Sequence, residues 1–231
     1  QRIEIVENGL AGYKAKTAEY DIDTVTSDDA DKLESFDYEV GQFYFEHRNN
    51  LTEEETKEFD NILSKITALR NRISDVADEI ARIESAMNIY DTETVKSSDK
   101  ADIEQLVADI KVLTDGQNIT ADERAKLGNL DATADTLLAK IAETTAEYDR
   151  VIAAANGYDE ATVTSADKDA LVQLNDDIYA LALTDNVTEE EKENLENAHN
   201  KVLGLIDKLT AISDEIKRII EAVDKYVFES V

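Results

Sequence analysis

The side chains that most often carry nucleophilic or metal-ion chemistry are scarce in this chain. It has no cysteine and only two histidines, His47 and His199, which occupy non-equivalent places and lack a second ligand or triad partner at a characteristic spacing. It also lacks a glycine-rich phosphate loop. Carboxylates are abundant, but in so acidic a chain no pair stands out as an acid–base couple. We therefore expect a non-enzymatic protein with no catalytic residue and no cofactor.

A cluster of aspartates near the amino-terminal end is the one arrangement that suggests a metal ion. The pattern of a calcium-binding EF-hand is absent, because the cluster has no glycine at the turn and no closing glutamate at the required spacing. The corresponding segments later in the chain carry fewer acids. Helix capping and a solvated loop explain the cluster better, so we expect no metal site. The cluster consists of Asp21, Asp23, Asp28, Asp29 and Asp31.

A group of aromatic residues around position 40 is the best candidate for recognition chemistry. Phe36 and Phe43 fall on the apolar side of a helix and are expected in the core. The other aromatics lie off that side or at its edge, next to an arginine, which is the composition of a protein-binding hot spot. In the alternative interpretation, Tyr44 and Phe45 only cover the end of the helix bundle or the junction of the shared helix. The candidate partner-binding residues are Tyr38, Tyr44, Phe45 and Arg48.

The elements that position these residues recur along the chain. Short motifs appear three times in the same order, and four tyrosines mark matching places 70, 68 and 68 residues apart. A period of this size is typical of an array of equivalent helical or other supersecondary units. The copies are Thr24–Ser27, Thr94–Ser97 and Thr162–Ser165; Asn50–Thr52, Asn118–Thr120 and Asn186–Thr188; and Tyr20, Tyr90, Tyr158 and Tyr226.

Each repeat contains two helix-start signals. In the first, a serine is followed by acids and then by apolar residues at three- and four-residue spacing, which predicts a short helix beginning at Ser27, Ser97 or Ser165. In the second, a threonine precedes a glutamate by three residues, as in a capping box. The asparagine before each threonine also creates an N-x-T glycosylation acceptor, but capping already explains the threonine. The capping pairs are Thr52 and Glu55, Thr120 and Glu123, and Thr188 and Glu191.

After each capping box an apolar seam runs at alternating three- and four-residue steps to the next tyrosine. This heptad pattern predicts one long helix per repeat, and the absence of proline and the presence of only 7 glycines fit that interpretation. Short and long helices then alternate. We predict an all-α fold of tandem antiparallel three-helix bundles that share their long helices in an elongated rod, by architectural analogy with spectrin.

The predicted bundles cover residues 1–72, 73–140 and 141–208, with a trailing helix of a truncated repeat at 209–231. Residues 1–20 fit the second half of a truncated long helix. A competing interpretation places tight turns near Ser74, Ala142 and Ser213, which would make each repeat a separate compact bundle, because Ser-Asp pairs at Ser74 and Ser213 resemble helix caps.

The formal charge of −29, from 53 acidic and 24 basic residues, limits the classes of partner that we expect to bind. Nucleic acids and anionic lipids both require lysine and arginine to neutralise phosphate, so neither is expected to bind. No apolar run approaches the roughly 18 residues of a membrane span, so we expect no membrane insertion. Hydrophobic residues make up 42% of the chain, which is enough for a packed core. We also expect the protein to be a monomer.

The recurring T-V-x-S-x-D, N-x-T-x-E-E/D and heptad pattern, from Tyr20 to Tyr226, resembles the tandem helical modules of large Gram-positive cell-surface proteins. The FIVAR, albumin-binding and immunoglobulin-binding arrays are of this kind. The resemblance implies an extracellular segment of a wall-anchored bacterial surface protein that binds a host protein, such as an immunoglobulin or a serum protein. The alternative is a spacer that only projects other domains from the cell wall. No binding residue of those modules aligns onto this chain.

Overall fold

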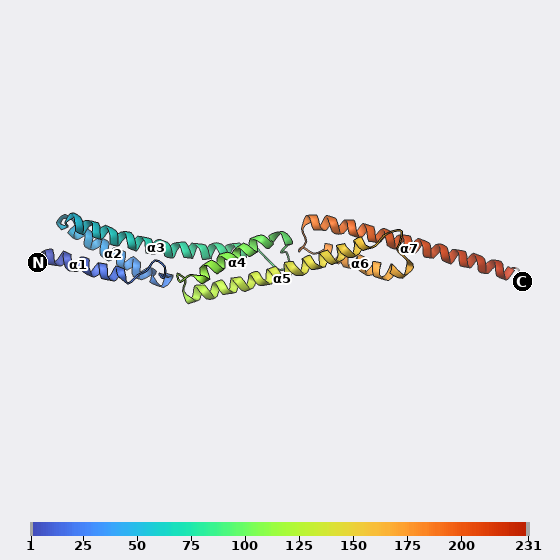
Figure 1. Ribbon diagram of the computed structural model, residues 1–231, viewed down its shortest axis with the longest axis horizontal. Coiled ribbons are helices and arrows are strands. Elements are labelled where there is room, and N and C mark those ends of the chain that lie inside the picture. The colour runs from blue at the N-terminus through green and yellow to red at the C-terminus, as the bar shows by residue number, and fades with distance from the viewer. Residues whose placement is uncertain (1, 230–231) are drawn as a thin grey trace. The chain divides into compact units, whose positions relative to one another are not determined.

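The computed structural model describes the backbone of residues 2–229 and the side chains of residues 4–225, and this part of the chain is all-α (Figure 1). The last seam position, Tyr226, lies outside the described side chains. Short 3₁₀ turns precede three of the helices, and one follows α2. The seven helices of residues 2–229 are α1 (Arg2–Ala18), α2 (Ala30–His47), α3 (Glu53–Met87), α4 (Lys100–Asp115), α5 (Ala121–Gly157), α6 (Lys168–Ala182) and α7 (Glu189–Glu229).

The three long helices begin at the predicted capping boxes and contain no break. Thr52 Oγ1 accepts from the Glu55 amide at 3.2 Å, and the Glu55 carboxylate accepts from the Thr52 amide at 2.7 Å. The same reciprocal pair forms at the start of α5 and of α7. The helices then continue through Ser74, Ala142 and Ser213, so the turns of the competing interpretation do not form.

The starts of the short helices differ in detail from the prediction. Serine does not cap them; instead a 3₁₀ turn such as Ser27–Asp29 comes first, and α2 begins at Ala30. The carboxylate at the end of the turn accepts from the amide of the residue before the serine, at 2.8 Å in both Asp99 to Lys96 and Asp167 to Thr164. The serine hydroxyl is thereby free for another contact, described below.

The chain divides into two compact units. The first comprises residues up to Ile89 together with Ile103–Ala134, and the second comprises Tyr90–Asp102 together with the residues from Asp135 onward. The three predicted bundle boundaries are not tested by this division and remain a prediction.

In the first unit, α1 and α2 both pack against the first half of α3 (Figure 1). The core there is aromatic at its centre, because Phe36 of α2 and Phe59 of α3 are fully buried. Gly9 of α1 faces Phe43, and a Cβ atom at Gly9 would lie 2.5 Å from the Phe43 ring. A glycine at this place therefore lets the aromatic end of α2 lie directly against the α1 backbone.

In the second unit, the core combines the end of α5 with α6 and the first half of α7. Its fully buried residues follow the predicted seams at three- and four-residue spacing, which confirms the side of each helix that was expected to face inward. They include Val151 of α5, Leu171 and Ile178 of α6, and Leu195 and Val202 of α7.

Candidate functional site

Three of the four predicted partner-binding residues lie together, two on one outer side of α2 and Arg48 in the 3₁₀ turn that follows it. Tyr38 and Phe45 are seven residues apart, which places them on the same side two turns apart, and they are 70% and 62% exposed. Gln42, between them, donates to the Tyr38 hydroxyl at 2.8 Å. The guanidinium carbon of Arg48 lies 4.3 Å from the Phe45 ring centre, which is a cation–π geometry. We call Tyr38, Gln42, Phe45 and Arg48 the α2 outer face.

Tyr44 lies apart from these residues. It is half-buried and packs on the core, with its ring centre 5.8 Å from that of Phe59. Its place on the helix, one residue before Phe45, turns it toward α3 because successive residues are about 100° apart. Tyr44 thus packs on the core whereas Phe45 is exposed, and partner binding through either residue stays a prediction.

The two histidines lie in separate surroundings. His47 packs on Phe43 with ring centres 4.4 Å apart, and the Nδ1 of His199 is buried beside Tyr179 without a hydrogen-bond partner. Among the described side chains, no three histidine or acidic groups are placed to hold a metal ion. In the aspartate cluster, Asp21 accepts from the amide of Asp23 at 2.8 Å and Asp29 accepts from that of Thr26, so these two acids serve the loop.

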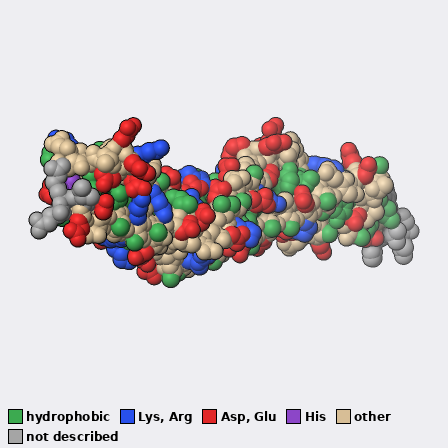
Figure 2. Space-filling view, turned by 60° about the vertical axis from the view of Figure 1, so that its left-hand side comes forward, with side chains coloured by type: hydrophobic (Ala, Val, Ile, Leu, Met, Phe, Trp, Pro, Cys, Tyr) green, Lys and Arg blue, Asp and Glu red, His purple; other side chains and the backbone are tan. Residues whose placement is uncertain are grey.

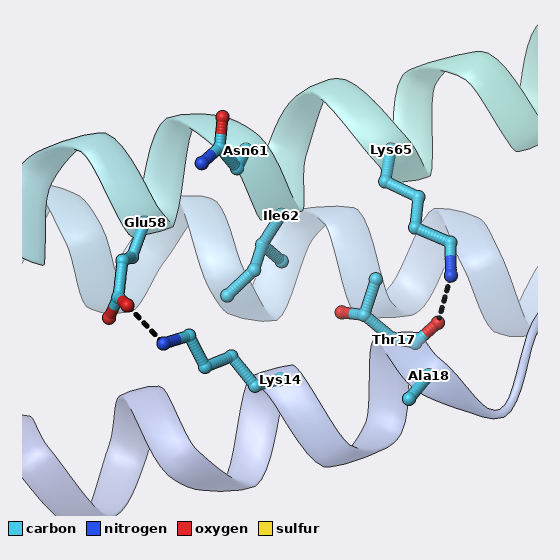
Figure 3. A pocket seen from close by; sticks show the side chains of 7 residues that line it. All are labelled: Lys14, Thr17, Ala18, Glu58, Asn61, Ile62 and Lys65. Carbon is cyan, nitrogen blue, oxygen red and sulfur yellow. Dashed lines mark hydrogen bonds and ion pairs between the residues drawn. The ribbon is translucent and has the colours of Figure 1, made fainter.

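A groove of about 290 Å³ lies between α1 and α3 (Figure 3). Its two lysines could act as nucleophiles or anion ligands only if they were free. Lys14 is ion-paired with Glu58, and Lys65 donates to the Thr17 carbonyl at 2.9 Å. Both amines are therefore engaged in holding α1 onto α3.

The asparagine of the second N-x-T motif makes a contact that the sequence did not reveal. Asn118 is 7% exposed, and its amide nitrogen donates to the carbonyls of Ile22 and Val25 at 2.9 and 3.1 Å. Arg72 completes the group by donating to the Asn118 amide oxygen at 2.9 Å. The start of α5 is thus fastened to the segment between α1 and α2, which we call the first linker (Asp21–Thr26).

The third N-x-T motif repeats this contact on the second linker (Asp91–Lys96). Asn186 is also 7% exposed and donates to the carbonyls of Thr92 and Val95 at 2.9 and 3.0 Å. Asn50, the first copy, is exposed. The recurrence of Asn-x-Thr at a fixed period was the available signal, but the motif was attributed to the threonine cap alone.

A serine hydroxyl accompanies each asparagine contact. Ser27 donates to the Glu123 carboxylate at 2.8 Å, and Ser97 donates to that of Glu191 at 2.7 Å. Burial raises the pKa of Glu123, but the hydrogen bonds from Thr120 and Ser27 outweigh burial and leave that pKa below its ordinary value. The capping glutamate of one repeat therefore accepts a hydrogen bond from the serine that follows the linker of the repeat before it.

A charged triad recurs where long and short helices meet. Arg82 of α3 binds Glu79 at 2.7 Å and also Asp109 of α4, while Arg150 of α5 binds Glu147 and Asp177 of α6, both at 2.6 Å. The arginine lowers the pKa of the glutamate on its own helix in both copies. Such exposed groups set the register of two helices more than they add stability.

The surface is predominantly acidic, with basic side chains scattered among the acids (Figure 2). No helix in the described range is both long enough and apolar enough to cross a membrane. Comparisons of this chain with protein-family models, with curated proteins and with solved structures give no match.

Proposed function

We propose that the chain is a non-enzymatic segment of a bacterial cell-surface protein and binds a host protein through the α2 outer face. The supporting observation is the exposed pair of rings, Tyr38 and Phe45, on one side of a single helix. The equivalent places in α4 hold Ala108 and Asp115, so the pair is a departure from the repeat. Aromatic rings and arginine are the side chains most enriched at binding hot spots.

The shape and charge of that surface support a folded host protein as the proposed ligand. A helix with two exposed rings two turns apart suits a shallow apolar groove on a folded protein, such as an immunoglobulin or another serum protein. The surrounding acids exclude an acidic partner, because like charges at the rim of an interface slow association. The extracellular location and the wall-anchored parent protein belong to the same proposal and rest on the resemblance of the repeat pattern.

The test is a pull-down from human serum and mucosal secretion with the full chain and a Tyr38→Ala/Phe45→Ala variant. We expect one protein to be retained by the parent chain and lost by the variant. The matched control is Tyr179→Ala, which removes an aromatic ring, 56% exposed, from the equivalent helix α6 and should not change retention. Equal retention by all three chains, or by none, contradicts binding through α2.

The second candidate function is a spacer, and the buried asparagine contacts favour it. Asn118 and Asn186 fasten the second and third repeats to the preceding linker in the same way, as an array built for reach requires. On this proposal the repeats are three-helix bundles that share long helices. Small-angle scattering tests it, because a radius of gyration near the 17 Å or so expected for a compact chain of this length would refute an elongated array.

A further inference from the structure

The second half of α7 presents an apolar stripe to solvent. Its members lie at three- and four-residue spacing, so they follow one side of the helix. Scattered apolar residues on a surface are ordinary, but a continuous row marks a face that another element covers. The stripe consists of Ile212, Ile216, Ile219 and Val223, which are 47%, 52%, 49% and 53% exposed.

The same four positions are buried in the earlier long helix α3. Counted from the capping threonine, they are Val76, Ile80, Ile83 and Met87, and none is more than 5% exposed. The pair Glu84–Lys126, at 2.6 Å, joins that half of α3 to α5, and the triad around Arg82 joins it to α4. A short helix and the start of a long helix therefore cover this face where it is buried.

The charged pair on α7 indicates which side chain a covering element should bring to this face. Glu215 and Arg218 are paired at 2.5 Å, as the glutamate and arginine are in the other two triads. The Arg218 side chain is 70% exposed, whereas those of Arg82 and Arg150 are 48% and 49% exposed. In both complete triads the third member is an aspartate on a short helix, held in turn by a glutamine four residues earlier.

In the third linker (Asp159–Thr164), the repeated valine is likewise less buried than in the other two linkers. Val163 is half-buried, whereas Val25 and Val95, its equivalents, are 2% and 1% exposed beneath an asparagine contact. The carbonyl of Glu160, equivalent to that of Ile22, accepts from Lys208 at 2.8 Å. A flexible lysine thus holds the acceptor that an asparagine takes in the other two linkers.

We propose that the apolar stripe of α7 and the third linker together bind a helical hairpin with the chemistry of α4 and the first half of α5. Its short helix supplies an apolar seam and a Gln-x-x-x-Asp pair, and the aspartate binds Arg218. Its turn supplies Asn-φ-Thr-x-x-Glu, where φ is an aliphatic residue. The asparagine donates to the carbonyls of Val163 and Glu160, displacing Lys208, and the glutamate accepts from the Ser165 hydroxyl.

A second copy of this chain does not offer a free hairpin with this chemistry. Its α4–α5 and α6–α7 hairpins are engaged with α3 and α5 of their own chain, through Glu84–Lys126 and Arg150–Asp177. Its α2–α3 hairpin has Phe43 where α4 has Leu113, and Phe43 needs a glycine opposite, as Gly9 provides. The equivalent residue of α7 is Glu215, whose Cβ would meet the ring. The occupant is therefore a hairpin with an aliphatic residue at that place.

Titration calorimetry of the full chain with a synthetic peptide of residues 96–140 tests the proposal. We expect saturable binding with one peptide per chain. Ile216→Glu/Ile219→Glu should weaken it by at least about 100-fold, because two apolar contacts are lost. The control is Val172→Glu, which places on exposed α6 the residue that stands there in the other two repeats, Glu34 and Glu104, and it should leave the affinity unchanged.

A charge exchange checks the register of the bound hairpin. Arg218→Glu should weaken binding roughly fivefold, and a peptide carrying Asp109→Lys should restore most of that loss with this variant only. Loss without recovery overturns the predicted register.

Joining the peptide to the chain makes its binding intramolecular, which removes the entropic cost of bringing two separate molecules together. With the same segment joined after residue 231 by a flexible linker, we expect slower amide hydrogen exchange over residues 212–223. Absence of both binding and protection overturns the proposal. Self-association of the unmodified chain that is lost in Ile216→Glu/Ile219→Glu also overturns it, because the occupant would then be a second copy.

Discussion

The side-chain amide of Asn118 supplies two hydrogen-bond donors that the linker backbone cannot supply for itself. A linker between helices exposes carbonyls that lack a partner within regular structure, and such groups are costly when buried. The amide nitrogen carries two donors and satisfies the carbonyls of both Ile22 and Val25. Aspartate, the nearest isostere, offers no donor when ionised and cannot replace it.

Asn118→Ala should lower the free energy of unfolding by about 1–3 kcal/mol, because it leaves two carbonyls buried without a donor. Asn186→Ala should behave in the same way. Asn50→Ala is the matched control, since Asn50 is exposed, and its effect should stay within about 0.5 kcal/mol. Urea denaturation followed by circular dichroism measures all three, and equal effects at Asn50 and Asn118 would show that the asparagine acts only through the helix cap.

At the residue scale, the sequence predicted some side-chain environments correctly and left others open. It placed Tyr38 and Phe45 off the apolar side, and both are exposed, because helical periodicity alone decides that question. It left Tyr44 ambiguous, since a residue at the edge of a seam turns inward or outward according to the neighbour it meets. The asparagine contacts join residues more than ninety positions apart, and no local pattern encodes such a pair.

At the scale of helices, the predicted starts of the long helices are confirmed, because the sequence of each long helix carries two separate signals. The capping box fixes its first residue and the uninterrupted heptad seam fixes its side and extent, so α3, α5 and α7 begin where expected. The short helices were displaced by a few residues, because a 3₁₀ turn and an α-helical turn use the same capping residues.

The glycines of α1 provide a test of packing between elements. Gly9→Ala should destabilise the chain by about 1–3 kcal/mol, because its Cβ would lie 2.5 Å from the Phe43 ring. Gly12→Ala, where an added Cβ meets nothing within 4 Å, should instead stabilise it by up to about 1 kcal/mol through helix propensity. Thermal unfolding of both variants, and of Gly9→Ala with Phe43→Leu, separates the two effects. Failure of Phe43→Leu to recover stability would contradict the clash.

For the whole molecule, the net charge of −29 sets the conditions under which it is most stable. Repulsion among carboxylates at neutral pH opposes the folded state and weakens as they become protonated. The capping and triad carboxylates act in the opposite direction. The pKa of Glu55 and of Asp177 is lowered by hydrogen bonds, so their stabilisation is complete above the ordinary carboxyl pKa and is lost as pH falls through the lowered one.

The two effects predict a maximum in the free energy of unfolding at roughly pH 5 in low salt, with a fall toward roughly pH 3. Sodium chloride at about 0.5 M should raise stability at pH 7 and flatten the rise between pH 7 and 5, because it screens surface repulsion. Urea titrations across this range measure both. Stability that increases steadily up to pH 7 in low salt would contradict a dominant role for repulsion.

The asparagine contacts also bear on how such a gene changes length. Asn118 and Asn186 recognise main-chain carbonyls, so the side chains of the linkers can drift, as Ile22 and Thr92 show, without loss of recognition. A repeat that carries this asparagine, and an aliphatic residue at the place of Leu113, can therefore follow any other. Unequal crossing-over that adds or removes a whole period leaves every remaining junction intact, whereas an insertion of a few codons within α4 would misalign one. Selection should thus preserve the period while tolerating variation in copy number.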